Sequence, residues 1–148
     1  AGISGDTSSG GLARIDYWLS MPLKLFILEL GINDLLRGTS PKTTMNNLQL
    51  IIDRVKTKYP QAKLALMGME IPDFIPGTFS SEFRSIFRKL ADINQMVFVP
   101  FFLEGVADQA HLNMTDGLHP SAVGYRIIAD KVWPVIKPLL TKDNLTQF

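Results

Sequence analysis

Asp116 and His119, three residues apart in the segment DGLHP, are the pair of side chains best suited to chemistry in this sequence. Acyl transfer needs a base whose pKa lies near neutrality, and a histidine held by a carboxylate meets that need. Gly117 lets the chain turn back, so that the aspartate can reach the imidazole Nδ1. Spacing alone also allows a turn that caps the next helix, with a surface histidine. The other histidine, His111, has no acid at a comparable turn and is interpreted as a surface residue.

Two further positions could donate hydrogen bonds to an oxyanion, the charged oxygen that forms during acyl transfer. Asn33 follows a buried apolar run and a glycine, so its side-chain NH₂ would project over the end of a strand. Gly5 offers a backbone N–H that no side chain shields. Each also has a plainer interpretation, an Asn-Asp turn for Asn33 and an ordinary loop glycine for Gly5. Taken alone, these signals are weak.

The elements that must position these groups alternate between strands and helices, and Ser40-Pro41 is a typical helix start. Alternating units predict a parallel sheet with helices on both faces, and ligands bind outside the carboxyl ends of its strands. The expected strands are 23–30, 62–69 and 96–101, and the expected helices are 6–19, 40–59, 79–93 and 121–140. Side chains expected to face the core include Leu12, Ile15, Leu19, Leu48, Ile52, Val55, Phe83, Phe87, Leu90, Val123, Ile127, Ile128, Val132 and Ile136.

Composition excludes several classes of protein. The length suits a single domain over residues 1–148, and 46% hydrophobic residues can build a sizeable core. The 15 basic residues balance 14 acidic ones without forming a basic stripe, so no nucleic-acid partner is expected. The absence of cysteine excludes a disulfide framework and a thiol nucleophile. No apolar run approaches the roughly 20 residues that span a bilayer, so no membrane span is expected.

Four segments together resemble the SGNH (GDSL-type) hydrolases, nearest the bacterial arylesterase and thioesterase I-like lysophospholipase branch. They are ISGDTSSGGLARID, FILELGINDLLRG, VPFFLEGVA and DGLHPSAVGYRIIADKVWP. The resemblance runs from Gly2 to about Leu140, and its specific parts are the GxND and DxxHP blocks. It implies a three-layer α/β/α, flavodoxin-like fold with a parallel sheet.

The resemblance also implies roles for the candidate residues. Gly5 and Asn33 match the family's oxyanion-hole donors, and Asp116 and His119 match its catalytic acid and base. Members hydrolyse small carboxylic esters, thioesters or lysophospholipids (the EC 3.1.1 class) through an acyl-enzyme, without metal or organic cofactor. The expected partner is therefore a small acyl ester, and resemblance weakly favours a periplasmic or secreted location.

Four apolar side chains could line the acyl group of such a substrate, by the same resemblance. They lie after the first expected strand, in the loop IPDFIPG and in the segment DGLHP: Leu35, Phe74, Ile75 and Leu118. Ordinary loop packing is the alternative interpretation for each.

One block of the family is not found in this sequence. The nucleophilic serine belongs to a Gly-Asp-Ser segment that follows the first strand of the family fold. Here the only comparable dipeptide, Gly5-Asp6, is followed by Thr7, which is not interpreted as a nucleophile. We therefore expect a domain truncated at its N-terminus, lacking the first strand, inactive alone and paired with a companion N-terminal fragment of the same protein.

Two other kinds of function are weighed against a hydrolase. A non-catalytic module could retain the ligand-binding cleft without a nucleophile. The segment SGDTSSGG could instead cradle a phosphate before a helix, but it lacks the lysine of a P-loop and the glycine spacing of a dinucleotide site.

Overall fold

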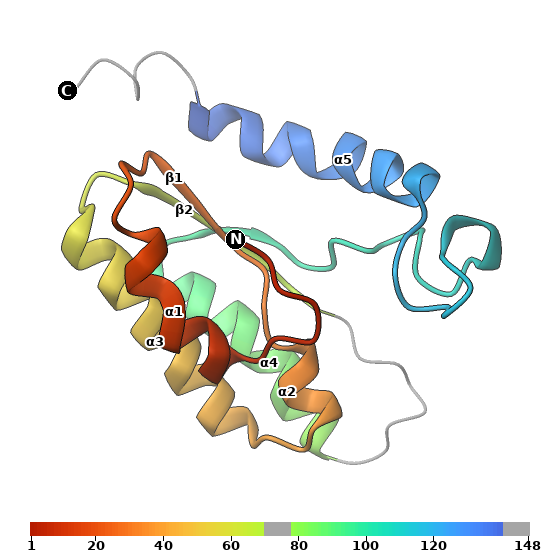
Figure 1. Cartoon of the computed structure of the whole chain (residues 1–148), viewed down its shortest axis with the longest axis horizontal. Helices are drawn as coiled ribbons and strands as arrows, with labels where there is room; N and C mark the ends of the chain where they lie inside the picture. Colours follow the sequence, from red (N-terminus) through yellow and green to blue (C-terminus); the bar gives the residue numbers. More distant parts are fainter. Residues whose placement is uncertain (70–77, 141–148) are drawn as a thin grey trace. The chain divides into compact units, whose positions relative to one another are not determined.

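The computed structural model describes residues 1–69 and 78–140. Contacts divide the chain into two compact units, Ala1–Pro100 and Phe101–Phe148, both drawn in Figure 1. The single domain expected over residues 1–148 stays a prediction. Among the described helices, none combines the length and apolar character needed to cross a membrane.

A parallel sheet of three strands forms the centre of the first unit, in the order β1-β2-β3. The strands are β1 (Leu25–Leu28), β2 (Lys63–Met67) and β3 (Val97–Val99). Leu25 pairs with Lys63, and Ala65 pairs with Val97. A parallel pair needs a crossover connection, and the chain has helices between β1 and β2 and between β2 and β3. The three expected strands are confirmed, each somewhat shorter than its apolar run.

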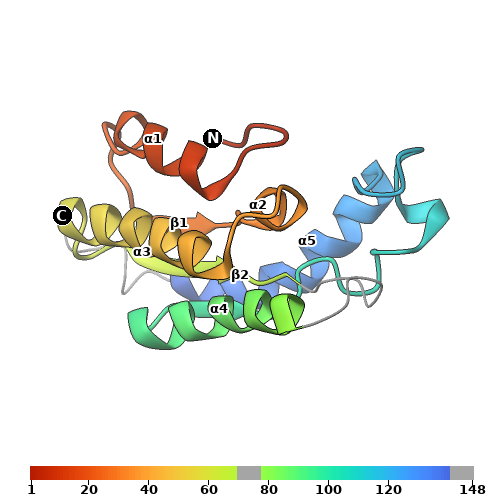
Figure 2. The ribbon, with the colours of Figure 1, turned by 90° about the horizontal axis from the view of Figure 1, so that it is seen from below.

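Three long helices pack beside one another in this unit. They are α1 (Ser8–Trp18), α3 (Pro41–Lys58) and α4 (Thr78–Asn94), and Figures 1 and 2 show them side by side in that order. The α3 helix begins where its sequence predicts, because the Ser40 hydroxyl accepts a hydrogen bond from Thr43 N and Pro41 occupies the first turn. Period-two alternation places Leu64 and Leu66 of β2 on the face that the helices cover. The most buried core side chains are Leu48, Ile51, Ile52, Val55, Leu66, Phe83, Phe87 and Leu90.

No pattern in the sequence predicted one element, the short helix α2 (Ile32–Leu36) directly after β1. Gly31 precedes it with φ +129°, a conformation that favours glycine. Asn33 and Asp34 therefore lie in the first turn of a helix that begins at the carboxyl end of β1. That end is where open α/β sheets place ligands.

The second unit contains a short 3₁₀ helix, η1 (Ala110–Leu112), followed by α5 (Ala122–Ile136) and η2 (Lys137–Leu140). The hydroxyl of Ser121 caps α5 by accepting from Gly124 N. Together, α5 and η2 confirm the helix expected over 121–140. A small core gathers Val106, Leu112 and Ile128.

The inward orientation expected for Val123 is wrong, since within the described residues this side chain is 58% exposed. Its neighbour Gly124 is buried instead, and a Cβ there would lie 2.3 Å from the carbonyl oxygen of Leu112. This close approach of helix and loop backbones sets the rotation of α5. The buried stripe consequently runs through Gly124 and Ile128, one helical turn apart, and Val123 points away from it.

Candidate active site

The structure brings Asp116 and His119 into direct contact within the second unit. Asp116 Oδ2 lies 2.8 Å from Nδ1 of the imidazole. Asp116 Oδ1 accepts from the backbone N–H of His119 at 3.0 Å and of Leu118 at 2.9 Å. Gly117 has φ +70°, which allows the tight turn between the two side chains. The backbone bond from His119, then its side-chain bond, then the Leu118 bond lower the pKa of Asp116 to about 2.

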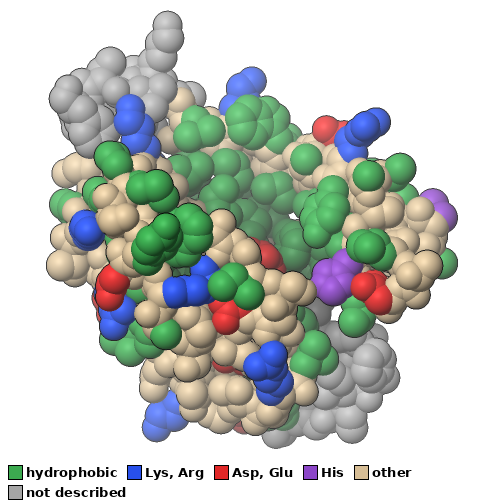
Figure 3. All heavy atoms as spheres, viewed as in Figure 1, with side chains coloured by type: hydrophobic (Ala, Val, Ile, Leu, Met, Phe, Trp, Pro, Cys, Tyr) green, Lys and Arg blue, Asp and Glu red, His purple; other side chains and the backbone are tan. Residues whose placement is uncertain are grey.

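This contact leaves the second ring nitrogen of His119 facing solvent. The imidazole is 57% exposed, and the part of the chain that the structure describes offers Nε2 no hydrogen bond. Both histidines are exposed, and their purple side chains are visible on the surface in Figure 3. A carboxylate accepts at Nδ1, so the neutral ring carries its proton there, and Nε2 is the nitrogen free to act as a base.

Short-range backbone bonds hold the turn that carries the pair. Met114 N donates to His119 O at 2.7 Å, and Gly117 N donates to Met114 O at 2.9 Å. Residues 113 and 120 form an antiparallel bridge that closes the loop. The Asn113 side chain donates to Val106 O at 2.8 Å, which ties the loop to the core of the unit. The pair thus lies on a turn that is fixed at both ends.

The first unit brings Asn33 and the loop of Gly5 together. Asn33 Nδ2 donates to the carbonyl oxygen of Asp6 at 2.9 Å. Because that carbonyl can only accept, the contact fixes which way the amide points and leaves its second N–H free. The Gly5 carbonyl accepts from Arg37 Nη2 at 2.7 Å, while the Gly5 N–H makes no hydrogen bond to any described residue. Two unengaged N–H donors therefore lie on adjoining segments.

A buried carboxyl group lies next to these donors and was not identified from the sequence: that of Asp34, which directly follows Asn33. Asp34 is 1% exposed and accepts from Ser8 N at 2.7 Å, from Ser8 Oγ at 2.5 Å and from Thr44 Oγ1 at 3.2 Å. Asn47 Nδ2 donates in turn to Ser8 Oγ at 2.9 Å. A signal was present: Ser8 and Thr44 are polar residues on the inward stripes of their helices, in step with Ile15 and Leu48.

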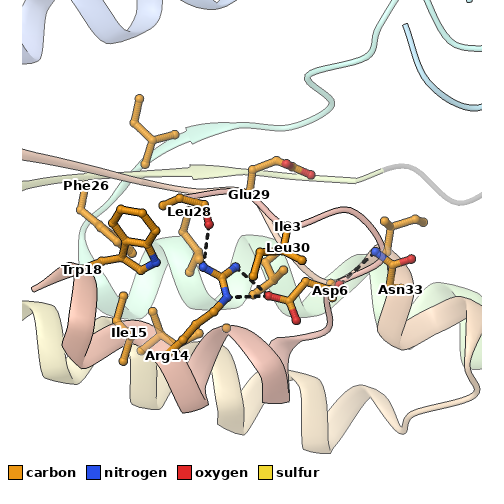
Figure 4. A pocket seen from close by; sticks show the side chains of 17 residues that line it. Ile3, Asp6, Arg14, Ile15, Trp18, Phe26, Leu28, Glu29, Leu30 and Asn33 are labelled. Carbon is orange, nitrogen blue, oxygen red and sulfur yellow. Dashed lines mark hydrogen bonds and ion pairs between the residues drawn. The ribbon is translucent and has the colours of Figure 1, made fainter.

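A groove of about 400 Å³ lies between α1 and the free edge of β1. Figure 4 shows Ile15 and Trp18 of α1 lining it opposite Phe26 and Leu28 of β1. At its end the guanidinium of Arg14 holds Asp6 at 2.6 Å. Within the described sheet β1 pairs only with β2, so the backbone N–H and C=O groups of its other edge face this groove.

Glu29, which directly follows β1, also lines the groove. Its side chain still reaches solvent, yet partial desolvation raises the pKa of its carboxyl group. Ionisation of this carboxyl group is therefore less favourable than in water, in a groove lined by both apolar and polar side chains.

The residues expected to line a substrate fall into three groups. Leu35 is 5% exposed and packs into the core of the first unit, so its described contacts are packing contacts. Leu118, beside the catalytic candidate His119, is 70% exposed. Phe74 and Ile75 lie outside the described residues. The substrate-lining role stays a prediction for all four.

The first unit carries amide donors at the end of a strand, and the second carries a carboxylate-held histidine; acyl transfer uses groups of both kinds. The chain belongs to the GDSL-like lipase/acylhydrolase family, whose sequence pattern matches residues 1–127. This family consists of enzymes that hydrolyse carboxylic esters and related acyl compounds, so the expected class of enzyme is confirmed.

Individual relatives agree with this assignment. The chain is 36% identical to esterase TesA of Pseudomonas aeruginosa, covering 95% of this chain and 69% of the relative. It is 38% identical to an arylesterase of Vibrio mimicus, covering 88% and 64%. It thus spans about two thirds of the length of these relatives.

Solved structures confirm the fold class. A crystal structure of TesA matches with a TM-score of 0.87 at 36% identity, over 95% of this chain and 77% of that one. The esterase EstA from Pseudoalteromonas matches with a TM-score of 0.86 at 32% identity, over 95% and 76%. The expected α/β class of the SGNH hydrolases is therefore correct.

Proposed function

We propose that this chain supplies the acid, the base and the oxyanion donors of a serine-dependent ester hydrolase. The observation that carries the proposal is the 2.8 Å contact between Asp116 Oδ2 and His119 Nδ1, which leaves Nε2 free. A backbone-held carboxylate that orients an imidazole in this way is the acid–base part of an acyl-transfer triad. The relatives named esterase and arylesterase support the same chemistry.

The reaction proceeds in two matched halves. His119 Nε2 removes the proton of a serine hydroxyl as its oxygen attacks the acyl carbon, and the resulting imidazolium is stabilised by Asp116. The carbonyl oxygen becomes an oxyanion, which accepts from the free Nδ2–H of Asn33 and from the N–H of Gly5. The imidazolium then protonates the leaving alkoxide, leaving an acyl-enzyme. Water repeats the sequence, releasing the carboxylic acid and restoring the serine.

The nucleophilic serine is proposed to come from outside these 148 residues, on a companion strand. No serine here follows a strand in a Gly-Asp-Ser segment, and Ser8 is fully buried and engaged by Asp34 and Asn47. The groove beside β1 is the structural feature that supports the proposal of a companion strand. The edge of β1 that faces the groove has no partner strand in the described sheet. Helix α1 packs mainly against α3 and makes few contacts with β1. A strand there would cover the partly exposed Trp18 and complete the hydrogen bonds of β1.

Hydrolysis of p-nitrophenyl acetate tests the proposal in four samples. They are the full-length gene product, its His119→Ala and His111→Ala variants, and this 148-residue chain. We expect His119→Ala to lower kcat by on the order of 10⁴-fold or more, since removing one member of a triad disables the whole unit. His111 is the matched control, an exposed histidine with no carboxylate partner among the described residues, and its loss should leave kcat unchanged.

The 148-residue chain should show no turnover above that of the buffer, with its fold checked by circular dichroism. Full activity of the His119→Ala variant would remove the proposed base. Turnover by the isolated chain at the full-length rate would place the nucleophile within these residues. Running p-nitrophenyl esters of increasing acyl length, an acyl thioester and a lysophospholipid in parallel identifies the preferred substrate.

A non-catalytic module that binds acyl ligands is the second candidate, favoured by the absence of a Gly-Asp-Ser segment from this sequence. The reading frame upstream of Ala1 separates the two. An in-frame Gly-Asp-Ser block after a strand pattern supports the enzyme, and a frame without one supports the binding module.

A further inference from the structure

The buried carboxyl group of Asp34 joins α2, which carries the proposed oxyanion donor Asn33, to the start of α1, which follows the loop that carries the other donor, Gly5. Asp34 directly follows Asn33 in α2, and both of its oxygens accept from Ser8, the first residue of α1. Ser8 lies three residues after Gly5. A tie between Asp34 and Ser8 therefore limits how far the Gly5 N–H can move from the Asn33 amide.

We propose that Asp34 is a positioning residue that sets the geometry of the oxyanion hole through Ser8. The inference rests on the proposed function, because it concerns the donors assigned there. Asp34 touches neither substrate nor reacting atoms in this scheme, and it acts only by holding the loop before α1 against α2.

The other two ties between these segments are weaker restraints. The Arg37 bond to the Gly5 carbonyl is exposed, so water competes with it. The Asn33 bond to Asp6 O uses the very amide that must also meet the oxyanion. The Asp34 contacts are buried and charge-assisted, which makes them stronger and shorter than bonds between neutral groups. Asp34 thus provides the one of these three contacts that is buried and does not involve a group that binds the oxyanion.

Two side chains of α3 reinforce the contact between Asp34 and Ser8. Thr44 of α3 donates to Asp34 Oδ1, and Asn47 of the same helix donates to Ser8 Oγ. Ser8 N lies at the start of α1, where the helix dipole favours a negative charge. Three helices therefore meet at one carboxylate, and no buried side-chain N or O atom among the described residues is left without a partner.

The test uses the full-length gene product and p-nitrophenyl acetate, with kcat and KM measured separately. Asp34→Asn should lower kcat by about 10- to 100-fold with KM within about twofold, since displacing a donor weakens transition-state binding more than substrate binding. Ser8→Ala is the milder second variant, which keeps the Ser8 N–H bond, and it should lower kcat by a smaller factor. Should Asp34→Asn fail to fold, Ser8→Ala carries the test.

A matched control separates positioning from general loss of stability. Asn94 of α4 is 6% exposed and donates to Gln49 and to Leu90 O, and it makes no hydrogen bond to the described residues of α1 or α2. Asn94→Ala should lower Tm while leaving kcat unchanged. Amide hydrogen exchange at Ser8 should accelerate in Asp34→Asn and stay unchanged in Asn94→Ala.

A double-mutant cycle with Gly5→Ala gives the decisive result. If Asp34 acts by holding the Gly5 donor through Ser8, Asp34→Asn should add no more than about twofold to the kcat loss of Gly5→Ala, because residues acting as one unit are non-additive. If the kcat loss of the double variant equals the product of the two single losses, the positioning role is overturned. A kcat loss in Asn94→Ala equal to that in Asp34→Asn would also overturn it.

A different pattern of results would show that the proposed function itself is wrong. In that case Gly5→Ala itself leaves kcat unchanged, although exchange at Ser8 still responds to Asp34→Asn. That outcome also overturns the positioning role, and the exchange measurement shows that the assignment of the donor, rather than the tie, was wrong.

Discussion

A comparison of Gly5→Ala with Gly38→Ala separates backbone strain from chemistry at the proposed oxyanion hole. Both glycines have positive φ, +74° for Gly5 and +70° for Gly38. A Cβ on Gly5 would meet only Arg37 Nη2, at an ordinary 3.7 Å, and one on Gly38 would meet nothing within 4 Å. Neither substitution creates a clash, so the two share one structural cost.

That cost follows from the left-handed backbone. An L-residue in this conformation loses about 1–2 kcal/mol, offset by about 0.4–1 kcal/mol because alanine has less conformational freedom than glycine in the unfolded chain. The net loss is about 1 kcal/mol for either variant, or roughly 3 °C in Tm for a protein of this size. Thermal unfolding followed by circular dichroism should therefore give nearly equal shifts.

Activity should distinguish the two variants. Relief of the strain at residue 5 rotates the peptide whose N–H is the proposed donor, and losing one such donor costs about 10²–10³-fold in kcat. We expect Gly5→Ala in the full-length gene product to lose about 10²-fold in kcat on p-nitrophenyl acetate, and Gly38→Ala to lose none. Equal Tm shifts with full activity in Gly5→Ala would show that the Gly5 N–H is not a donor. Equal kcat losses in both would assign the effect to strain.

Two further predictions concern the second unit. Because hydrogen bonds depress the pKa of Asp116 in the folded state, their contribution to stability should be complete above about pH 4 and lost as the pH falls through about 2. The amide proton shifts of Leu118 and His119 should titrate with that low midpoint in NMR spectra; a midpoint near 4 would contradict the hydrogen bonding. Gly124→Ala should lower Tm and kcat together, because its Cβ would lie 2.3 Å from Leu112 O in the loop that holds the acid–base turn. Unchanged Tm would show that this approach is not tight in solution.

Elements with local signals were predictable from the sequence. The start of α3 followed from Ser40 and Pro41, since capping depends on residues within one turn. The short helix α2 was missed because five residues show no helical period, and a glycine with φ +129° at its start is typical of a loop. The predicted orientation of Val123 was wrong because the close approach of Gly124 to the backbone of Leu112 sets the rotation of α5. Hydrophobic periodicity carries no information about that contact.

The candidate site divides along the same line. The contact of Asp116 with His119 was predictable because a glycine turn and a spacing of three residues decide it. The contact of Asn33 with Asp6 spans 27 residues, and no pattern in the sequence encodes it. The buried role of Asp34 was missed because an aspartate after a strand suggests a turn, whereas its burial requires donors from Ser8 and Thr44 on two other helices.

This difference in range has a consequence for the reaction. The bonds of the acid–base turn join residues two to seven positions apart, so damage to the core of the first unit should leave them formed. The oxyanion donors depend on contacts 26 to 32 residues apart, which exist only when α1 and α2 are packed. The two halves of the chemistry can therefore be lost separately. A variant with a normal Asp116 titration but a much reduced kcat has lost the donors, and one with an Asp116 midpoint near 4 has lost the acid–base turn.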